Sequence, residues 1–448
     1  MKQKFQISGR MTDMTTGSPL ALILRFALPL VAASMLQQVF SLTDTMVLGI
    51  FAGNQAIAVL GVCLWPVWLQ VSVLTNLGQA ACLLTAVRFG AKDEAALRRA
   101  VGCVYRTAVW VGLLFIPALM LLTKPFLRLQ NTPEAILDEA AEYLWIIFLG
   151  TVFLLVYNIL SSLLRAVGDS LTSFYAILIS AVINLGLDVL LVAGFGMGTI
   201  GAAAATSVSQ AFSAAICLWK LRSYPMFHLR REELRFDPPL LREYARLCLP
   251  MMAQSFVIAG GGTYVQACIN QYGVDFAAGV SAAGKLFSVL ETGAIGLASA
   301  CASFVSQNVG ACQFGRIRSA VRQIMGLTLV AALVLGIGLW LAGPWLLRIY
   351  VTADALDCAV EQMHAYCIGL LLMYPMYSLR QTVQSLGNLQ IPLLAALLQL
   401  AARMSTARFL PLWLGRSGIY YTGIAAWAVS LLLIGFIYPR QLRKCSRT

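Results

Sequence analysis

Two carboxylates stand inside long apolar runs of this sequence. Asp44 lies in "LQQVFSLTDTMVLG" (36–49), and Asp188 lies in "INLGLDVLLV" (183–192), four residues after Asn184. Residues four apart share one face of a helix, so Asn184 and Asp188 should point the same way. Two carboxylates in a dry site cannot both stay ionised without a cation. The sequence therefore predicts a site that holds a proton or a sodium ion, since carboxylate, amide and hydroxyl oxygens suit a hard cation.

Depth along the helices predicts which other side chains complete this site. Asp44 and Asp188 both stand near the end of their apolar runs, and Thr206 lies about two turns into the next run, at about 1.5 Å per residue. These three side chains should therefore meet at one end of a helical bundle, and Asn158, somewhat deeper, is expected to join through its amide. The alternative is that Asp44 and Asp188 only form hydrogen bonds with neighbouring helices.

The elements that must position these residues are membrane-spanning helices. Of 448 residues, 59% are hydrophobic and 11% are charged, which excludes a soluble globular protein. The apolar runs are each about 20 residues or longer, long enough to cross a bilayer as a helix and too uniformly apolar for barrel strands. We predict an all-α integral membrane protein of about twelve transmembrane helices, near 24–48, 57–82, 101–123, 140–163, 172–194, 199–219, 247–270, 279–303, 321–343, 363–386, 391–412 and 419–438.

The distribution of positive charge predicts the topology. The net charge is +13, and the Lys and Arg residues concentrate in alternate loops and at both termini. Loops of this kind mark the cytoplasmic face, so we predict a multi-pass protein of the plasma (inner) membrane with both termini cytoplasmic. Basic residues spread along one membrane face also argue against nucleic-acid binding. The 11 cysteines show no CxxC pair or metal-ligand spacing, so neither a disulfide framework nor a cofactor is expected.

The sequence repeats at an offset of about 220 residues. "RFALPLVAASMLQQ" (25–38) resembles "RLCLPMMAQSFVIA" (246–259), which puts Pro29 opposite Pro250. Two later segments keep the same register, and both halves start on the same side, so the repeat is parallel with a pseudo-two-fold axis along the membrane normal. We predict a six-helix bundle with the cation site over 1–219, a basic cytoplasmic linker over 220–246 and a second six-helix bundle over 247–448.

The second half does not duplicate the acidic site. The repeat places Arg403 opposite Asn184 and Ala407 opposite Asp188. Arg403 is open to three interpretations: it snorkels to the interface, pairs with an acidic group or repels cations. Lys285 and Glu291 are candidates for an ion pair of their own.

Repeated membrane bundles usually bind a substrate between their halves and work by alternating access, which favours transport. Proline bends a helix, so Pro29 and Pro250 should kink the first helix of each half, and Pro29 is a candidate hinge that couples protonation of Asp44 to closure. Candidate substrate contacts are polarizable or amphipathic side chains, for which packing or lipid contact is the alternative. They are Gln37, Met251, Met252, Gln254 and Tyr264, with Arg403.

Four segments together resemble the multidrug and toxic compound extrusion (MATE) family. They are "GSPLALILRFALPLVAASMLQQVFSLTDTMVLG", "RFGAKDEAALRRAVG", "LLRAVGDS" and "GTIGAAAATSVSQ", and the resemblance runs from about residue 17 to 438. The absence of acidic residues from the second half resembles the prokaryotic branch related to DNA-damage-inducible protein F.

The resemblance implies a cation-coupled antiporter that exports amphipathic, often cationic compounds against protons or sodium ions. It also implies a coupling site that matches Asp44, Asn184, Asp188 and Thr206. One departure is Ser41, which stands where many relatives carry an asparagine ligand. The expected partners are small amphipathic molecules and membrane lipid, and the protein is expected to be a monomer.

The sequence leaves two other classes of protein as alternatives. An intramembrane enzyme is disfavoured because the only histidines are His228 and His364 and no HExxH motif is present. A lipid-linked oligosaccharide flippase is the nearer alternative, since such flippases share this general architecture. A flippase would need a cationic groove for pyrophosphate, for which only Arg403 and Lys285 are candidates.

Overall fold

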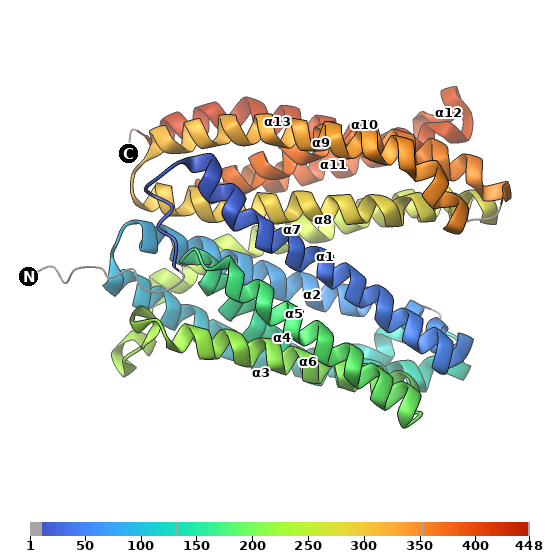
Figure 1. Ribbon diagram of the computed structural model, residues 1–448, viewed down its shortest axis with the longest axis horizontal. Helices are drawn as coiled ribbons and strands as arrows, with labels where there is room; N and C mark the ends of the chain where they lie inside the picture. Colours follow the sequence, from blue (N-terminus) through green and yellow to red (C-terminus); the bar gives the residue numbers. More distant parts are fainter. Residues whose placement is uncertain (1–10, 131, 351–352, 447–448) are drawn as a thin grey trace, which may run out of the picture. The chain divides into compact units, whose positions relative to one another are not determined.

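The computed structural model describes residues 11–130, 132–350 and 353–446, which form helices joined by short turns, with no strand among them (Figure 1). The prediction of an all-α membrane protein is confirmed, and twelve long helices account for the predicted apolar runs. The long helices are α1 (Pro19–Phe51), α2 (Gly53–Gly90), α3 (Glu94–Leu129), α4 (Glu134–Ala166), α5 (Ser170–Asp188), α6 (Gly198–Arg222), α7 (Pro238–Asn270), α8 (Val274–Gly310), α9 (Phe314–Tyr350), α10 (Ala353–Ser385), α11 (Gln390–Phe409) and α13 (Thr422–Cys445). The short elements are α12 (Pro411–Leu414), a π-helical segment (Val189–Gly194) and 3₁₀ turns at Pro225–Phe227, Arg231–Leu234 and Gly415–Tyr421.

The last two predicted spans differ from the observed helices. The run 391–412 does not form one helix, because α11 ends at Phe409 and Pro411 begins the short α12. Proline lacks the backbone donor that a continuing helix needs, which explains the break. The run 419–438 begins inside a 3₁₀ turn, and α13 itself starts only at Thr422.

Two long helices are less apolar than the others. Nine segments of the described chain are long and apolar enough to cross a membrane by hydropathy alone, and one of them, Gln390–Cys445, includes both α11 and α13. Helices α7 and α10 are not among the nine. Both carry polar side chains that the fold buries: Gln254 on α7 is 7% exposed, and Arg380 and Gln384 on α10 are 8% and 3% exposed. Gln384 Nε2 donates to Gln254 Oε1 at 3.0 Å, so the two helices satisfy each other's polar groups.

The helices form two compact units, and α1 and α7 each contribute to both. Unit 1 contains Ala32–Cys248 together with the described residues before Met14, and unit 2 contains Met14–Val31 and Leu249 onward. The first half of α1 therefore packs in unit 2, whereas its second half packs in unit 1. The division predicted at 219 and 247 stays a prediction, since these units are defined by packing rather than by the repeat.

In unit 2, the first half of α1 is held by apolar packing and by an arginine. Ile23, Phe26 and Leu30 of α1 belong to the same buried cluster as Phe304 of α8. Arg316, at the start of α9, donates to the carbonyl oxygen of Gly17 at 2.8 Å and to that of Met14 at 3.2 Å. The segment before α1 is thus fixed to the α8–α9 turn.

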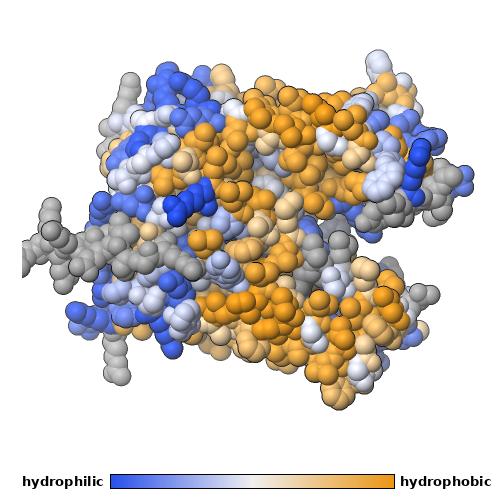
Figure 2. Space-filling model, viewed as in Figure 1, coloured by the Kyte–Doolittle hydropathy of each residue, from blue (hydrophilic) through white to orange (hydrophobic). Residues whose placement is uncertain are grey.

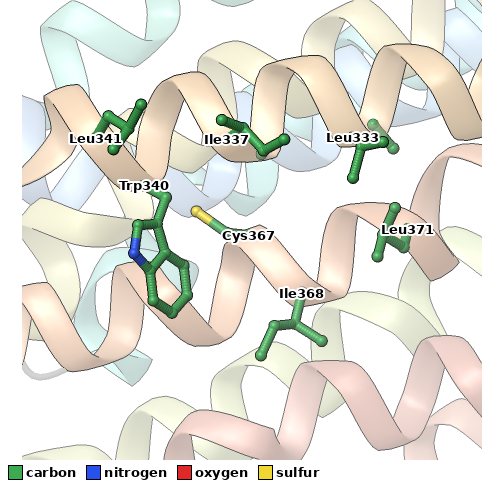
Figure 3. A pocket seen from close by; sticks show the side chains of 9 residues that line it. Leu333, Ile337, Trp340, Leu341, Cys367, Ile368 and Leu371 are labelled. Carbon is green, nitrogen blue, oxygen red and sulfur yellow. The ribbon is translucent and has the colours of Figure 1, made fainter.

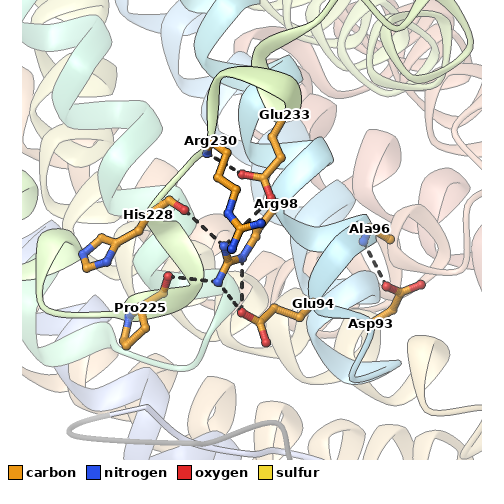
Figure 4. Close-up of polar contacts among 8 residues, drawn as sticks. All are labelled: Asp93, Glu94, Ala96, Arg98, Pro225, His228, Arg230 and Glu233. Carbon is orange, nitrogen blue, oxygen red and sulfur yellow. Dashed lines mark hydrogen bonds and ion pairs between the residues drawn. The ribbon is translucent and has the colours of Figure 1, made fainter. Parts of the chain in front are cut away.

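In unit 1, the predicted linker folds onto the start of α3 (Figure 4). Arg98 of α3 binds Glu94 at 2.5 Å and reaches Glu233 at 3.9 Å. The same guanidinium donates to the carbonyl oxygens of Pro225 at 3.4 Å and His228 at 3.3 Å. One side chain therefore joins α3 to both 3₁₀ turns of the linker.

Apolar and polar surfaces separate along the helices of each unit. In Figure 2, hydrophobic residues cover the middle of the helices that face the viewer, and hydrophilic residues gather toward their ends. The exposed apolar side chains are large, for example Leu113 (62%) and Leu121 (78%) of α3 and Leu341 (74%) of α9. An apolar surface of this extent is stable in hydrocarbon and not in water, as expected of a multi-pass membrane protein.

Candidate cation site

The second half of α1 packs against α5 and α6 at the end of unit 1 that lies away from the linker. Val47 and Leu48 of α1 share a buried cluster with Val192 and with Ala202 of α6. This packing fixes the helix face on which Asp44 lies, one turn before the cluster. Sequence depth had predicted that these three helices meet here.

Asn184 bridges the two carboxylates. With its amide nitrogen facing them, Asn184 donates to Asp188 Oδ2 at 2.8 Å and to Asp44 Oδ1 at 3.0 Å, and its oxygen accepts from the backbone N–H of Thr206 at 3.2 Å. The Thr206 hydroxyl lies 3.5 Å from Asp44 Oδ2. The four residues that the sequence singled out thus come together.

The site has more acceptors than donors. Asp188 is 1% exposed and Asn184 2% exposed, and Asp44 is half-buried. Asn184 holds the carboxyl groups of Asp44 and Asp188 close to each other, because its amide donates to one oxygen of each. Asp188 Oδ1 is fully buried and has no hydrogen-bond donor among the residues described. A buried acceptor beside a second carboxylate is costly unless a proton or a cation satisfies it.

The backbone changes type directly after Asp188. Regular α5 ends at Asp188, and Val189–Gly194 continues as a π-helix, with α6 starting at Gly198. Short π segments are uncommon and occur often at functional sites, where they re-aim side chains. No sequence pattern predicted this segment, because the run 172–194 is uniformly apolar around Asp188.

Asn158, which the sequence predicted as a member of the site, uses its amide elsewhere. Asn158 Nδ2 donates to the Leu154 carbonyl oxygen at 2.9 Å, one turn back in α4, so its amide is used within its own helix. The side chain of Ser41 lies outside the described residues.

Two polar side chains of α4, which no sequence pattern singled out, contact the first half of α6. Tyr143 packs against a buried cluster that includes Ala203 of α6, three residues before Thr206. Glu139, one turn earlier, accepts from Thr199 Oγ1 and from Gln55 Nε2, each at 2.9 Å. Glu139 therefore ties the ends of α2 and α6 to α4. The four-residue spacing of Glu139 and Tyr143 is the signal that could have found them.

The predicted substrate residues divide between the units. Gln37 is exposed in unit 1, whereas the remaining five belong to unit 2, where Met251 and Gln254 are buried. The side chain of Arg403 packs against the glycines of α7. A Cβ atom on Gly261 would stand 3.2 Å from the Cδ atom of Arg403. The absence of side chains on α7 makes room for this arginine.

The predicted Lys285–Glu291 pair is wrong. Glu291 Oε1 instead accepts from the Tyr377 hydroxyl at 2.6 Å, and no ion pair between Lys285 and Glu291 occurs in the described part of the chain. Six residues separate the two on α8, which is not a helical spacing that brings side chains together.

A cavity of about 200 Å³ lies between α9 and α10 of unit 2 (Figure 3). Trp340, Ile337 and Leu333 from α9 line it together with Cys367, Ile368 and Leu371 from α10. None of the predicted substrate residues is among its lining residues. Its lining carries no charged side chain, so nothing here would select a charged ligand.

The helices and the buried carboxylates together indicate the class of this protein. Long apolar helices in two units, with a cluster of ionisable residues buried in one of them, are typical of polytopic membrane transporters. The MatE family model matches the chain twice, at residues 29–190 and at 250–407, and the chain therefore belongs to the MATE family of membrane transporters. The two matches start at Pro29 and Pro250, which confirms the predicted repeat.

Similar proteins include several bacterial ones. "Probable multidrug resistance protein YoeA" of Bacillus subtilis (strain 168) is 26% identical over 446 residues, which cover 94% of this chain and 93% of that protein. "Multidrug export protein MepA" of Staphylococcus aureus (strain MSSA476) is 22% identical, with 94% of each chain covered.

Solved structures show the same fold. A MATE structure described as the straight conformation superposes with a TM-score of 0.92 at 17% identity, covering 99% of this chain and all of that one. A structure described as the bent conformation gives a TM-score of 0.90 at 17% identity, covering 97% of this chain and 98% of that one. The more specific resemblance to the branch of DNA-damage-inducible protein F stays a prediction.

Proposed function

We propose that this protein is a cation-coupled antiporter that exports amphipathic, often cationic drugs or toxic compounds by alternating access. The observation that carries the proposal is the Asp44–Asp188 pair, in which Asp188 Oδ1 is buried without a donor. Multidrug names among the similar proteins support the substrate class. Family membership favours this function over the flippase alternative.

The chemistry of the pair supports coupling. A proton shared between Asp44 and Asp188, or a sodium ion held by them with Asn184 and Thr206, removes the repulsion between two ionised carboxylates. Loading the site therefore stabilises the arrangement in which α1 packs against α5 and α6. Release of the cation restores the repulsion and favours separation of α1 from that face, which links ion movement to a change in α1.

The environment of the transporter follows from charge and composition. We place the protein in the plasma (inner) membrane as a monomer with both termini cytoplasmic, as the Lys and Arg distribution predicts. The linker, together with the start of α3 that Arg98 joins to it, then lies on the cytoplasmic side, and the cation site lies toward the outside. A site there would load its cation from the outside, as an exporter requires.

Export under separately imposed gradients tests this function. We expect a fluorescent cationic dye to accumulate in inside-out vesicles that contain the protein when one cation gradient, proton or sodium, is imposed with the other held at zero. The gradient that drives accumulation identifies the coupling ion. Equal accumulation with both gradients collapsed would contradict antiport.

Pro29 is expected to act as a hinge in α1. It lies two residues before the point at which α1 passes from unit 2 to unit 1. Replacing Pro29 by Ala restores a backbone hydrogen bond and stiffens this turn. We expect dye export to slow by about fivefold, equivalent to about 1 kcal/mol of barrier, with dye binding unchanged.

Pro250→Ala is the matched control, because Pro250 holds the same place in α7 without a carboxylate site to couple. Export by this variant should stay close to that of the unmodified protein. If Pro29→Ala exports dye as fast as Pro250→Ala, Pro29 is not a hinge of the cycle.

A further inference from the structure

Unit 1 contains a second cavity, of about 220 Å³, between α3 and the linker. Arg106, Thr107 and Trp110 from α3 line one side, and Arg235 and Phe236 from the linker line the other. The Arg106 guanidinium lies over the Phe236 ring, 5.6 Å from its centroid. The cavity thus has two arginines and two aromatic rings in its walls, unlike the uncharged cavity of Figure 3.

The sequence of α3 gives the depth of this cavity in the membrane. Arg106 is the last charged residue before seventeen uncharged residues, 107–123, and Lys124 is the next. At about 1.5 Å per residue this stretch spans about 26 Å, close to the thickness of the hydrocarbon core. Arg106 therefore stands at the level of the lipid headgroups, and Trp110 lies one turn deeper, where tryptophan is favoured at the interface.

The charge of the cavity is positive. Arg106 and Arg235 face a single carboxylate in the lining, that of Asp237. Asp237 Oδ1 accepts from the backbone N–H of Leu240 at 3.1 Å, which caps the start of α7, so part of its acceptor capacity is already used. The remaining positive charge favours an anion between the two arginines, and arginine binds phosphate oxygens well.

The surface below the cavity is apolar and exposed. Val109 is 60% exposed, Trp110 58% and Leu113 62%, all on the outward face of α3. An acyl chain that follows this face would leave a phosphate at the height of Arg106. A soluble anion would make no use of this apolar face.

We propose that this cavity binds one anionic phospholipid from the leaflet on the linker side. Its phosphate lies between Arg106 and Arg235, and its acyl chains run along Trp110 and Leu113. Because the linker carries Arg235, the bound lipid joins the linker to α3. The inference does not depend on the proposed transport cycle.

Native mass spectrometry of the full-length protein tests the lipid site. The protein is taken from nanodiscs with equal fractions of phosphatidylglycerol and phosphatidylcholine, and the retained lipids are counted. We expect retention of phosphatidylglycerol to exceed that of phosphatidylcholine. The variant Arg106→Gln/Arg235→Gln should reduce this preference by about twenty-fivefold, since each of the two interfacial arginines is worth about fivefold. The variant Arg99→Gln/Arg222→Gln, which removes two exposed arginines outside this cavity, should keep the preference.

A lysine variant and a competition with phosphate distinguish the possible outcomes. Arg106→Lys/Arg235→Lys keeps both charges and should retain most of the preference, which excludes loss of folding as the cause. An unchanged preference in Arg106→Gln/Arg235→Gln would overturn the proposal. Displacement of the lipid by inorganic phosphate in excess would also overturn it, because it would show a site for a free anion that makes no use of Trp110.

Discussion

We expect Asp188→Asn to lose gradient-driven export, and Asp44→Asn to do the same. The substitution keeps the size of the side chain but replaces an acceptor by an amide that neither binds a proton nor attracts a cation at this position. In Asp188→Asn the new amide can donate to Asp44, which removes the shortage of donors that marks the site. The pair then no longer changes charge during a cycle, so ion flow and export lose their link.

The expected loss of export is large because a carboxylate that cannot bind the coupling cation cannot couple its movement to export. We expect gradient-driven dye accumulation in inside-out vesicles to fall by about a hundredfold or more, equivalent to about 3 kcal/mol. Dye binding to the detergent-solubilised variants should persist, since the two carboxylates serve the cation.

Asp138→Asn is the matched control. Asp138 lies in the same unit, is exposed, and pairs with Lys124 at 2.8 Å at the surface. Exposed ion pairs contribute little, so this variant should export at the rate of the unmodified protein. Full export by Asp188→Asn at matched expression would leave Asp44 and Asp188 as structural polar residues and would contradict the mechanism.

Gly102→Ala destabilises the protein although alanine is the better helix former. Gly102 lies in the first third of α3, and a Cβ there would overlap the carbonyl oxygen of Glu233 in the linker. The obstacle is backbone, which no rotamer change relieves. The 3₁₀ turn Arg231–Leu234 must therefore move away from α3, which weakens the contact of Arg98 with Glu233.

The balance of two opposing energies predicts that Gly102→Ala lowers the stability of the protein. Alanine gains about 1 kcal/mol of helix propensity over glycine, whereas overpacking against a fixed neighbour costs about 1 to 3 kcal/mol, to which the weakened linker contacts add. We expect a lower midpoint of thermal unfolding in detergent and faster proteolysis within 223–237.

Gly112→Ala separates packing from propensity. Gly112 lies in the same helix, and its Cβ would meet only Leu155 Cδ2 at 3.5 Å, an ordinary contact. This variant should unfold at the same or a higher temperature. If the two variants behave alike, the close approach of the linker to α3 does not contribute to stability.

The sequence alone determined the membrane helices and the members of the acidic site. Twelve apolar runs were visible because the bilayer requires long uninterrupted apolar segments, and the repeat was visible because Pro29 and Pro250 keep the same register. Asp44, Asn184 and Asp188 could be found because charge in such runs is rare, and the spacing of Asn184 and Asp188 fixed their common face. The same reasoning wrongly paired Lys285 with Glu291, since local spacing does not reveal a partner such as Tyr377 on another helix.

The way in which these parts pack against one another became visible in the folded protein. The passage of α1 from unit 2 to unit 1 and the folding of the linker onto α3 depend on contacts between residues far apart in sequence, such as Arg98 with His228. The use of the Asn158 amide within α4 and the π-helical segment after Asp188 depend on backbone geometry that uniformly apolar runs do not encode. In a membrane helix most side chains are apolar, whether they face lipid or another helix. Composition therefore predicts that a segment forms a helix, whereas the packing of side chains determines which helices lie next to it.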